Sequence, residues 1–168
     1  MKKRICLVIC IGLCCLLCAC DPGSYSPEAE SLGDIVSIEL IEYTNEHQDH
    51  FISWVPDQFD QLLPFDSDNA TVLETLPVEK IADFLDAFQK TEILSEYYVY
   101  NSPKDICIRL NDANGDFLII WANYAEGSFV GYIGEYASDG TVLSFWGCFS
   151  ALQYYKDLVN QFFIYQLP

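Results

Sequence analysis

Four apolar segments separated by short turn sequences constrain the fold of this chain more than any other feature. The segments are ICIRL (106–110), FLIIWANY (117–124), SFVGYIGEY (128–136) and TVLSFW (141–146), with NDANGD, AEGS and ASDG between them. Apolar residues recur at about every second position in them, which is the period of a β-strand. Asn-Gly and Asp-Gly favour tight hairpin turns, because both central residues of such a turn need a positive φ. The sequence therefore predicts a four-stranded antiparallel meander.

Further strands are expected beside this meander. IVSIELIEY (35–43) alternates and is rich in β-branched residues, which indicates a strand, and ILSEYYVY (93–100) can open the sheet. FISWV (51–55) is another candidate strand. Residues 58–70 have no regular period and are predicted to form a loop. Its apolar anchors would be Phe59, Leu62, Leu63 and Phe65.

Two segments have helical spacing. Residues 76–90 place apolar side chains three or four positions apart, with Pro77 near the start, where its missing N–H is harmless. Residues 149–163 repeat this spacing, and Ser150 is the predicted N-cap. Because each helix has one apolar side, both must pack against the sheet. We expect an α+β fold, in which an antiparallel β-meander of four to six strands carries two helices on one face, in a single domain at 33–168.

The first twenty residues, MKKRICLVICIGLCCLLCAC, have the layout of a secretory signal. Three basic residues precede an apolar run that stops at Asp21. A membrane-spanning helix needs about 20 apolar residues to cross ~30 Å of hydrocarbon, and this run is shorter. A cleavable signal is therefore favoured over a permanent membrane span.

The end of this segment, LCAC, resembles the lipobox of bacterial lipoproteins. Leu17 lies three residues before Cys20, and the small Ala19 lies directly before it. The resemblance implies cleavage between Ala19 and Cys20 and transfer of a diacylglycerol to the Cys20 thiol. Two acyl chains hold a protein on a membrane almost permanently, because each buried CH₂ contributes about 0.8 kcal/mol.

This resemblance divides the chain into three parts. Residues 1–19 would be the signal peptide, 20–32 a lipid-anchored flexible spacer, and 33–168 the folded domain. The spacer sequence DPGSYSPEAES is poor in apolar residues, and at about 3.3 Å per residue it could reach roughly 35 Å. We expect the domain to be held at the cell membrane, facing outside the cytoplasm.

Signal removal makes the chain more acidic. The chain has 8 Lys and Arg against 25 Asp and Glu, and three of the basic residues leave with the signal, so that the formal charge changes from −17 to −20. Such a surface repels nucleic acids and anionic headgroups, which argues against a nucleic-acid partner. Solubility, a basic protein partner and divalent cations all remain open as the reason for this charge.

Residues suited to catalysis or metal binding are sparse. His47 and His50 can share a metal only if their segment is helical, so a solvated turn is favoured. Asp112, Asn114 and Asp116 are spaced like the start of a calcium loop, but the glycine and the final glutamate of such loops are missing, which favours a hairpin turn. The sequence predicts no catalytic residue, no metal site and no cofactor.

Two cysteines fall in the predicted domain. Cys107 shares a strand face with Arg109, and Cys148 is expected to begin the last helix. Outside the cytoplasm the two thiols can form a disulfide, which would contribute up to ~4 kcal/mol. Two buried thiols are the alternative, and spacing leaves both open.

Aromatic residues line the predicted meander. A sheet covered by helices on one face often leaves its other face partly exposed, and Tyr or Trp side chains there can recognise a protein or a sugar. Core packing is the alternative for each of them. The candidate binding surface consists of Trp121, Tyr124, Tyr132 and Tyr136.

The segments SPKDICIRLNDANGDFLII and YASDGTVLSFWGCFS, with the closing LVNQFF, are similar to small uncharacterised lipoproteins of Gram-positive gut bacteria. The shared features are turns and apolar periods, so the resemblance implies a fold and a location but no activity. We expect a non-enzymatic, membrane-anchored binding module for a protein or envelope component. An inhibitor or immunity-type lipoprotein against a basic enzyme or toxin is the alternative, and a cell-surface hydrolase is a second one.

Overall fold

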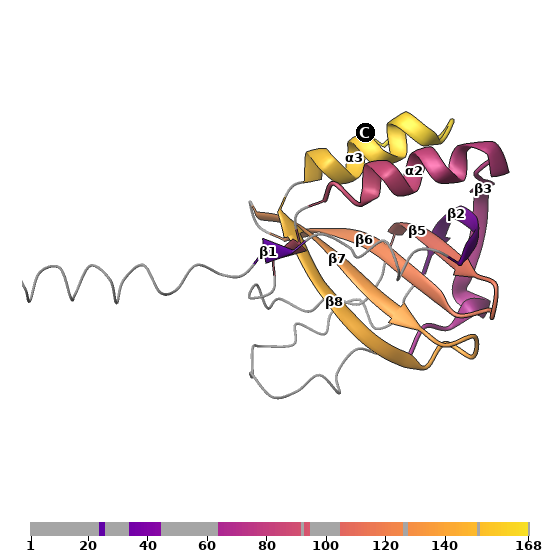
Figure 1. Ribbon diagram of the computed structural model, residues 1–168. Helices are drawn as coiled ribbons and strands as arrows, with labels where there is room; N and C mark the ends of the chain where they lie inside the picture. The colour runs from indigo at the N-terminus through magenta and orange to yellow at the C-terminus, as the bar shows by residue number, and fades with distance from the viewer. Residues whose placement is uncertain are drawn as a thin grey trace, which may run out of the picture.

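An antiparallel sheet of eight strands forms the centre of the domain (Figure 1). The structure is a computed structural model, and it describes residues 24–25, 34–44, 64–91, 93–94, 105–125, 128–150 and 152–167. The strands are β1 (Ser24–Tyr25), β2 (Ile35–Tyr43), β3 (Ala70–Thr75), β4 (Ile93–Leu94), β5 (Asp105–Asp112), β6 (Phe117–Ala125), β7 (Ser128–Tyr136) and β8 (Val142–Ser150). Their order in the sheet is β1-β4-β8-β7-β6-β5-β2-β3. The helical elements are the 3₁₀ helices η3 (Ser67–Asn69) and η4 (Val78–Lys80) and the α-helices α2 (Ile81–Phe88) and α3 (Leu152–Phe162).

Strands β5 to β8 form the predicted meander, in which each strand pairs with the next one along the chain. Gly115, between β5 and β6, has a φ of 94°, and Gly140, between β7 and β8, has a φ of 83°. Glycine adopts such angles without the steric cost of a side chain. Asn-Gly and Asp-Gly therefore lie at the turns that close these two hairpins, as the sequence predicts. The expected turn with two positive-φ residues is wrong, because Asn114 and Asp139 do not have a positive φ and only the glycine of each pair adopts that conformation.

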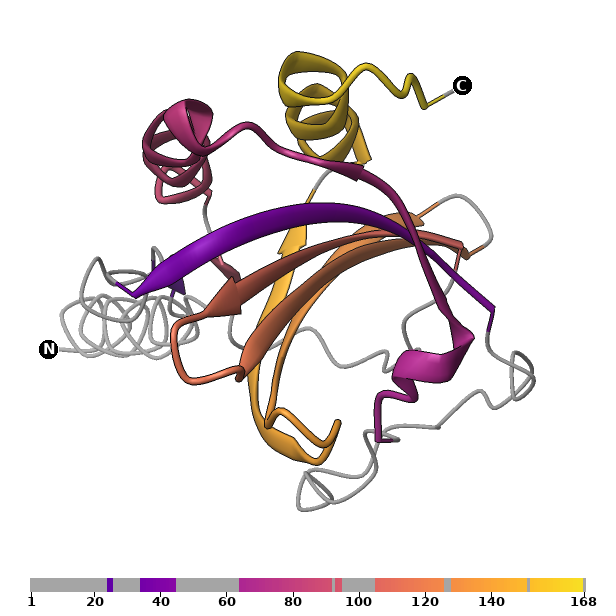
Figure 2. The same ribbon diagram turned by 90° about the vertical axis from the view of Figure 1, so that its right-hand side faces the viewer.

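Helices α2 and α3 lie on the same face of the sheet, and Figure 2 shows them next to each other above it. They bury their apolar sides against the sheet because each has a single apolar stripe. The side chains between helices and sheet form the helix-side core. It consists of Ile38, Leu40, Leu76, Ile81, Phe84, Phe88, Ile108, Leu110, Leu118, Ile120, Ala122, Ile133, Tyr155, Leu158, Val159, Phe162 and Phe163.

The predicted fold class is confirmed. The domain is α+β, its meander is antiparallel, and both helices pack on one face of a sheet in which six strands have six residues or more. Among the residues that the structure describes, no helix is long and apolar enough to cross a lipid bilayer.

A second core lies on the other face of the sheet. This aromatic core consists of Ile41, Tyr43, Phe65, Cys107, Phe117, Ile119, Trp121, Tyr132 and Tyr136. Alternation along the strands separates the two cores: in β2, Ile38 and Leu40 face the helices, whereas Ile41 and Tyr43 face away from them.

Three predicted boundaries are wrong. Strand β3 begins at Ala70, the last residue of the predicted loop at 58–70, and continues to Thr75, where no element was predicted; the β-branched Thr71 and Val72 pair with β2. Helix α3 begins at Leu152, and Ser150, the predicted N-cap, ends β8 where it pairs with Val130 of β7. Strand β1 falls within the predicted flexible spacer and pairs with β4, so the spacer is not free over its whole length.

Candidate functional site

The predicted aromatic binding surface is wrong for three of its four residues. Trp121, Tyr132 and Tyr136 are on the helix-free face, as expected, but they are 0%, 2% and 0% exposed. They pack as a core instead of forming an accessible surface. The side chain of Tyr124, the fourth residue, lies outside the described residues.

Phe65 explains part of this burial. Its ring stacks on Tyr43 at a centroid distance of 4.4 Å and meets Phe117 at 5.3 Å and Tyr136 at 5.7 Å. Its backbone N–H donates to the carbonyl of Gly140 at 2.9 Å. The segment before η3 is thereby held against the turn between β7 and β8, and the Phe65 ring packs in the aromatic core.

Polar atoms are enclosed in this aromatic core. The hydroxyl of Tyr136 is buried and finds no hydrogen-bond partner among the described residues, and burial raises the pKa of Tyr136 well above its usual value. Burial also raises the pKa of Tyr43, whose hydroxyl accepts a hydrogen bond from the N–H of Asp66 at 3.1 Å. An unpaired buried hydroxyl lowers stability, because it has lost its hydrogen bonds to water.

Of the two possibilities left open for Cys107 and Cys148, the strand pairing rules out the disulfide. The two cysteines are the ends of a row of paired residues that runs through Trp121 and Tyr132 across β5, β6, β7 and β8. Three strand spacings of about 4.8 Å separate them along the sheet, whereas a disulfide needs Cα atoms within about 7 Å. Cys148 is also in β8 and does not begin the last helix.

An ion pair borders the aromatic core at the junction of β2 and β5. The guanidinium of Arg109 donates to Oε2 of Glu39 from Nε at 2.8 Å and from Nη2 at 2.5 Å, and these side chains are 18% and 17% exposed. Asn111 donates to the same carboxylate oxygen and to the hydroxyl of Ser37. The guanidinium carbon lies 5.9 Å from the ring centroid of Phe117. Because these groups bind one another, the network links β2 to β5 and stabilises the strand pair.

The acidic turns are held by their own hydrogen bonds. Asp112 accepts from the backbone N–H of Asn114 at 2.7 Å, and Asp116 accepts from that of Ser138 at 3.0 Å. Hydrogen bonds from Thr141 lower the pKa of the exposed Asp139. These carboxylates shape turns, as Asp side chains often do. Within the described residues, no group of three or more potential metal-binding side chains comes together.

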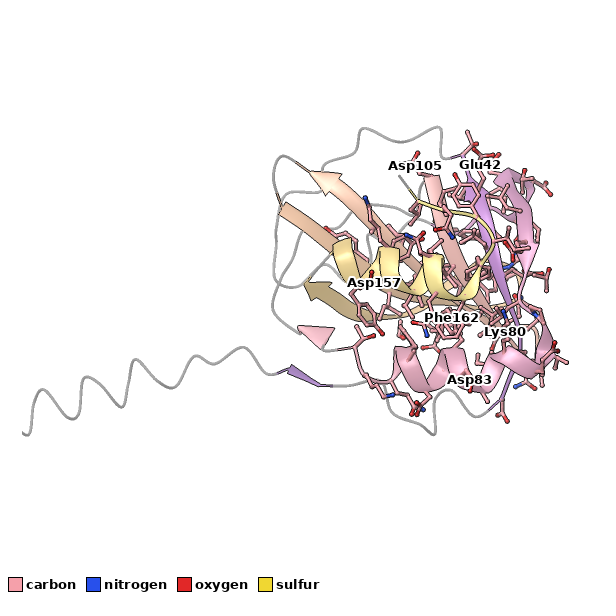
Figure 3. The ribbon with its side chains drawn as sticks, turned by 90° about the horizontal axis from the view of Figure 1, so that it is seen from above. Glu42, Lys80, Asp83, Asp105, Asp157 and Phe162 are labelled. Carbon is pink, nitrogen blue, oxygen red and sulfur yellow. The ribbon has the colours of Figure 1, made fainter. Side chains whose placement is uncertain are left out.

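A shallow groove of about 340 Å³ lies between α2 and α3. Figure 3 shows the buried Phe162 between the two helices, with Lys80 and Asp83 beside it. At one side of the groove, Lys90 and Asp86 form an exposed ion pair with a separation of 2.8 Å. Its charged groups are of both signs and stay in water, so the groove selects no particular ligand.

The edge of the sheet at β3 is the feature that sequence reasoning missed. β3 pairs only with β2 among the described residues, and its Val72 and Leu73 are 46% and 39% exposed. Glu74, on the same strand, accepts hydrogen bonds from the backbone N–H groups of Ile164 and Tyr165. The β-branched residues in ATVLET are a signal for this strand, but the stretch is short and follows a segment without period.

No protein-family model, curated protein or solved structure matches this chain.

Several predicted features lie outside the described residues. They are the signal peptide with Cys20, the segment FISWV, His47, His50, and the loop anchors Phe59, Leu62 and Leu63. Cys20 remains the one candidate modification site, and it precedes the first described strand by four residues.

Proposed function

We propose that this chain is a bacterial lipoprotein, anchored outside the cytoplasm by lipid on Cys20, and that its folded domain is a non-enzymatic binding module. The observation that carries the proposal is the LCAC sequence at the end of a short apolar run behind three basic residues. A lipid on Cys20 would hold the domain at the outer surface of the membrane.

The position of β1 supports a close attachment. Ser24 pairs with Leu94 in the sheet, and only residues 21–23 separate it from Cys20. Four residue steps of about 3.5 Å span at most ~14 Å. The domain would therefore be held close to the lipid, with the β1 edge of its sheet toward the membrane.

Lipid labelling of the full-length protein tests the anchor. The wild type, Cys20→Ser and Cys18→Ser would be expressed in a Gram-positive host grown with an alkyne fatty acid, and labelled protein would be detected in the membrane fraction. Cys18→Ser is the matched control, since it removes a neighbouring thiol. We expect the wild type and the control to carry label and to lack residues 1–19 by mass spectrometry, while Cys20→Ser carries none. Fatty-acid label on Cys20→Ser would refute the proposal.

An inhibitor or immunity-type role against a basic enzyme or toxin is the second candidate, and the formal charge of −20 after signal removal favours it. Complementary charge accelerates association and makes it sensitive to salt. Envelope proteins that co-purify with the full-length chain at low salt should be basic and should be lost at high salt. Partners retained equally at both salt concentrations would count against this candidate.

A further inference from the structure

We propose that the β3 edge of the sheet binds an extended, basic segment of another protein, which adds to the sheet as a further strand. The inference rests on the proposed function, because it names the partner class and the surface of the binding module. Four observations support it: an open strand edge, exposed apolar side chains, local charge and the position of the edge relative to the anchor.

The open edge supplies backbone hydrogen-bonding groups. In the described part of the chain β3 ends the sheet, so alternate N–H and C=O groups of this strand point away from β2. An extended peptide can pair with such a row, and these main-chain hydrogen bonds bind it without regard to its sequence. β3 contains neither proline nor lysine, two residues that commonly protect edge strands, and the one irregularity in its pairing with β2 is the register shift at Leu73.

Exposed apolar side chains concentrate along the same edge. Seven large apolar residues are exposed in the described part of the chain, and six of them belong to β3 or to segments beside it. Those six are Val36, Val72, Leu73, Val78, Ile164 and Tyr165, whereas the seventh, Leu143, is on β8. Two hydrogen bonds show which segments lie next to β3. The N–H of Ile164, in the C-terminal segment, donates to Glu74 of β3, and the N–H of Leu76, just after β3, donates to the carbonyl of Ile38 in β2. An added strand would lie directly beside Val72 and Leu73, which are on β3 itself.

The charge along this edge selects a basic partner. Four acidic residues are on β3 or within a few residues of it in the chain: Asp66, Asp68, Glu74 and Glu79. The first lysine or arginine after β3 is Lys80. A second copy of this chain would bring the same acids to the edge, and like charges oppose such pairing. A segment with lysine or arginine meets complementary charge instead.

The pairing register also suggests the side-chain pattern of the partner. The pairing of β2 with β3 shifts register between Leu40 and Ile41, which leaves Leu73 as an extra residue in β3. Because of this shift, Val72 pairs with Ile41 on the face of the aromatic core, whereas Glu74 pairs with Leu40 on the helix side. Successive side chains of an added strand point to opposite faces. The segment that fits best would therefore alternate apolar side chains, on the Val72 side, with basic ones, on the Glu74 side.

The anchor would place this edge away from the membrane. β1 and β3 are the two ends of the strand order, separated by seven strand spacings. At about 4.8 Å each, these spacings amount to ~34 Å along the sheet. With Cys20 held at the β1 edge, the β3 edge is the one presented to other proteins.

Peptide binding to the full-length protein in detergent micelles tests this inference. The probe is a short fluorescent peptide that alternates valine and lysine, and binding is followed by fluorescence anisotropy. Two control peptides are used. One alternates valine with glutamate. The other is the valine–lysine peptide with N-methyl groups along one edge, which removes the hydrogen bonds that this edge would make to β3. The protein variants are Val72→Lys and Leu73→Lys on the edge, with Leu143→Lys as the matched control because it is similarly exposed on β8.

We expect the valine–lysine peptide to bind and both control peptides to bind at least tenfold more weakly, about 1.4 kcal/mol. Val72→Lys and Leu73→Lys should each weaken binding by about tenfold or more, while Leu143→Lys leaves it unchanged. Equal binding of the N-methylated peptide, or equal effects of all three lysine variants, would overturn the inference and leave general charge attraction as the explanation. Dimers of the wild type that Val72→Lys abolishes would also overturn it, because the occupant would then be a second copy.

The same assay separates this inference from the proposed anchor. Cys20→Ser protein has an unchanged β3 edge and should bind the peptide like the wild type. If Cys20→Ser loses the lipid label and still binds the peptide, both proposals are supported. Label on Cys20→Ser refutes the anchor alone, and absent peptide binding in correctly lipidated protein refutes the edge alone.

Discussion

The two faces of the sheet are built in different ways. On the helix side the strands contribute aliphatic side chains, and the aromatic rings of that core come from α2, α3 and the residue after α3. On the other face the strands themselves contribute five aromatic rings, and Phe65 is added from an irregular segment. Beneath the helices, aliphatic strand residues fill the core together with rings from the helices, whereas on the other face, where no helix of the described residues packs, the strands themselves supply the large rings.

This difference also concerns polar groups. The aromatic core encloses the Tyr136 hydroxyl and is bordered by the ion pair of Arg109 with Glu39. On the helix side, the buried Tyr155 hydroxyl donates to the carbonyl of Ile106 at 2.6 Å. The helix-side core should therefore depend mainly on apolar volume, and the aromatic core on backbone geometry and charge pairing.

The largest effect is expected from a cavity in the helix-side core. Phe84 of α2 is fully buried and meets Phe162 at a centroid distance of 5.1 Å. Phe84→Ala should lower the free energy of unfolding by about 3–5 kcal/mol, as measured by urea denaturation. Val78→Ala is the control, since Val78 is 76% exposed, and should cost less than about 0.5 kcal/mol. Similar losses in the two variants would show that α2 is not a structural part of the core.

On the aromatic side, the next largest effect is expected at a glycine. A Cβ on Gly140 would lie 1.9 Å from the carbonyl oxygen of Phe65. Gly140→Ala should expel the Phe65 segment, with loss of about 3 kcal/mol from the strain of an L-residue at this φ and the exposure of one phenyl ring. Near-UV circular dichroism should weaken as the rings lose their fixed packing.

Gly115→Ala is the matched control for this substitution. Gly115 also has a positive φ, but its added Cβ meets only the Cβ of Ser138 at 3.4 Å. We expect a loss of about 1 kcal/mol, from backbone strain alone. Equal losses in the two variants would mean that the contact between Gly140 and Phe65 does not hold the aromatic core together.

A smaller effect is expected from the ion pair on the aromatic side. Glu39→Gln leaves the mostly buried guanidinium of Arg109 without its countercharge and should cost about 2 kcal/mol. The helix-side control is Asp86→Asn, which breaks an ion pair with Lys90 in which both side chains are 72% exposed, and should change stability by less than about 0.5 kcal/mol. The double variant Glu39→Met/Arg109→Met should recover most of the loss. Failure of that recovery would contradict the charge-pairing explanation.

The smallest effects come from two tyrosines, and their signs should differ. Tyr136→Phe removes a buried hydroxyl that has no hydrogen-bond partner among the described residues, and it should raise the free energy of unfolding by up to about 1 kcal/mol. Tyr155→Phe removes a hydrogen bond and should lower the free energy of unfolding by about 1 kcal/mol. Urea denaturation of both variants gives the two changes. Equal changes in the free energy of unfolding for the two variants would contradict the idea that the two hydroxyls differ in hydrogen bonding.

Alkaline pH supplies a second measurement on Tyr136. Burial raises the pKa of Tyr136, so above about pH 10 the unfolded chain loses the proton that the folded chain retains. The unfolded state then binds fewer protons, and stability falls as pH rises. Tyr136→Phe should make this decline less steep than in the wild type, and an unchanged slope would contradict the effect of burial on this hydroxyl.

Much of the fold follows from local patterns. The meander and both helices were predictable because periods of two and 3.6 residues extend over long segments, and turns such as Asn114-Gly115 carry strong signals. Strand β3 was missed because it is short and directly follows an irregular segment. Strand β1, with two residues, has no period at all.

Burial of the candidate site could not be predicted in the same way. Alternation placed Trp121 on the helix-free face correctly, because side-chain direction along a strand is a local property. It could not show that Phe65, from outside the meander, packs into that face. What covers a side chain depends on contacts between residues far apart in the chain.

Local sequence thus accounts for the helices, the long strands and the division of residues between the two faces, and it carries the LCAC sequence on which the proposed anchor rests. Strand order and the edges of the sheet follow from tertiary structure, because each strand can pair in several registers and with several neighbours until the whole sheet closes. That order puts β1, next to Cys20, at one edge and β3 at the other. The separation between the β1 edge and the β3 edge is therefore a property of the assembled sheet, since no local segment encodes it.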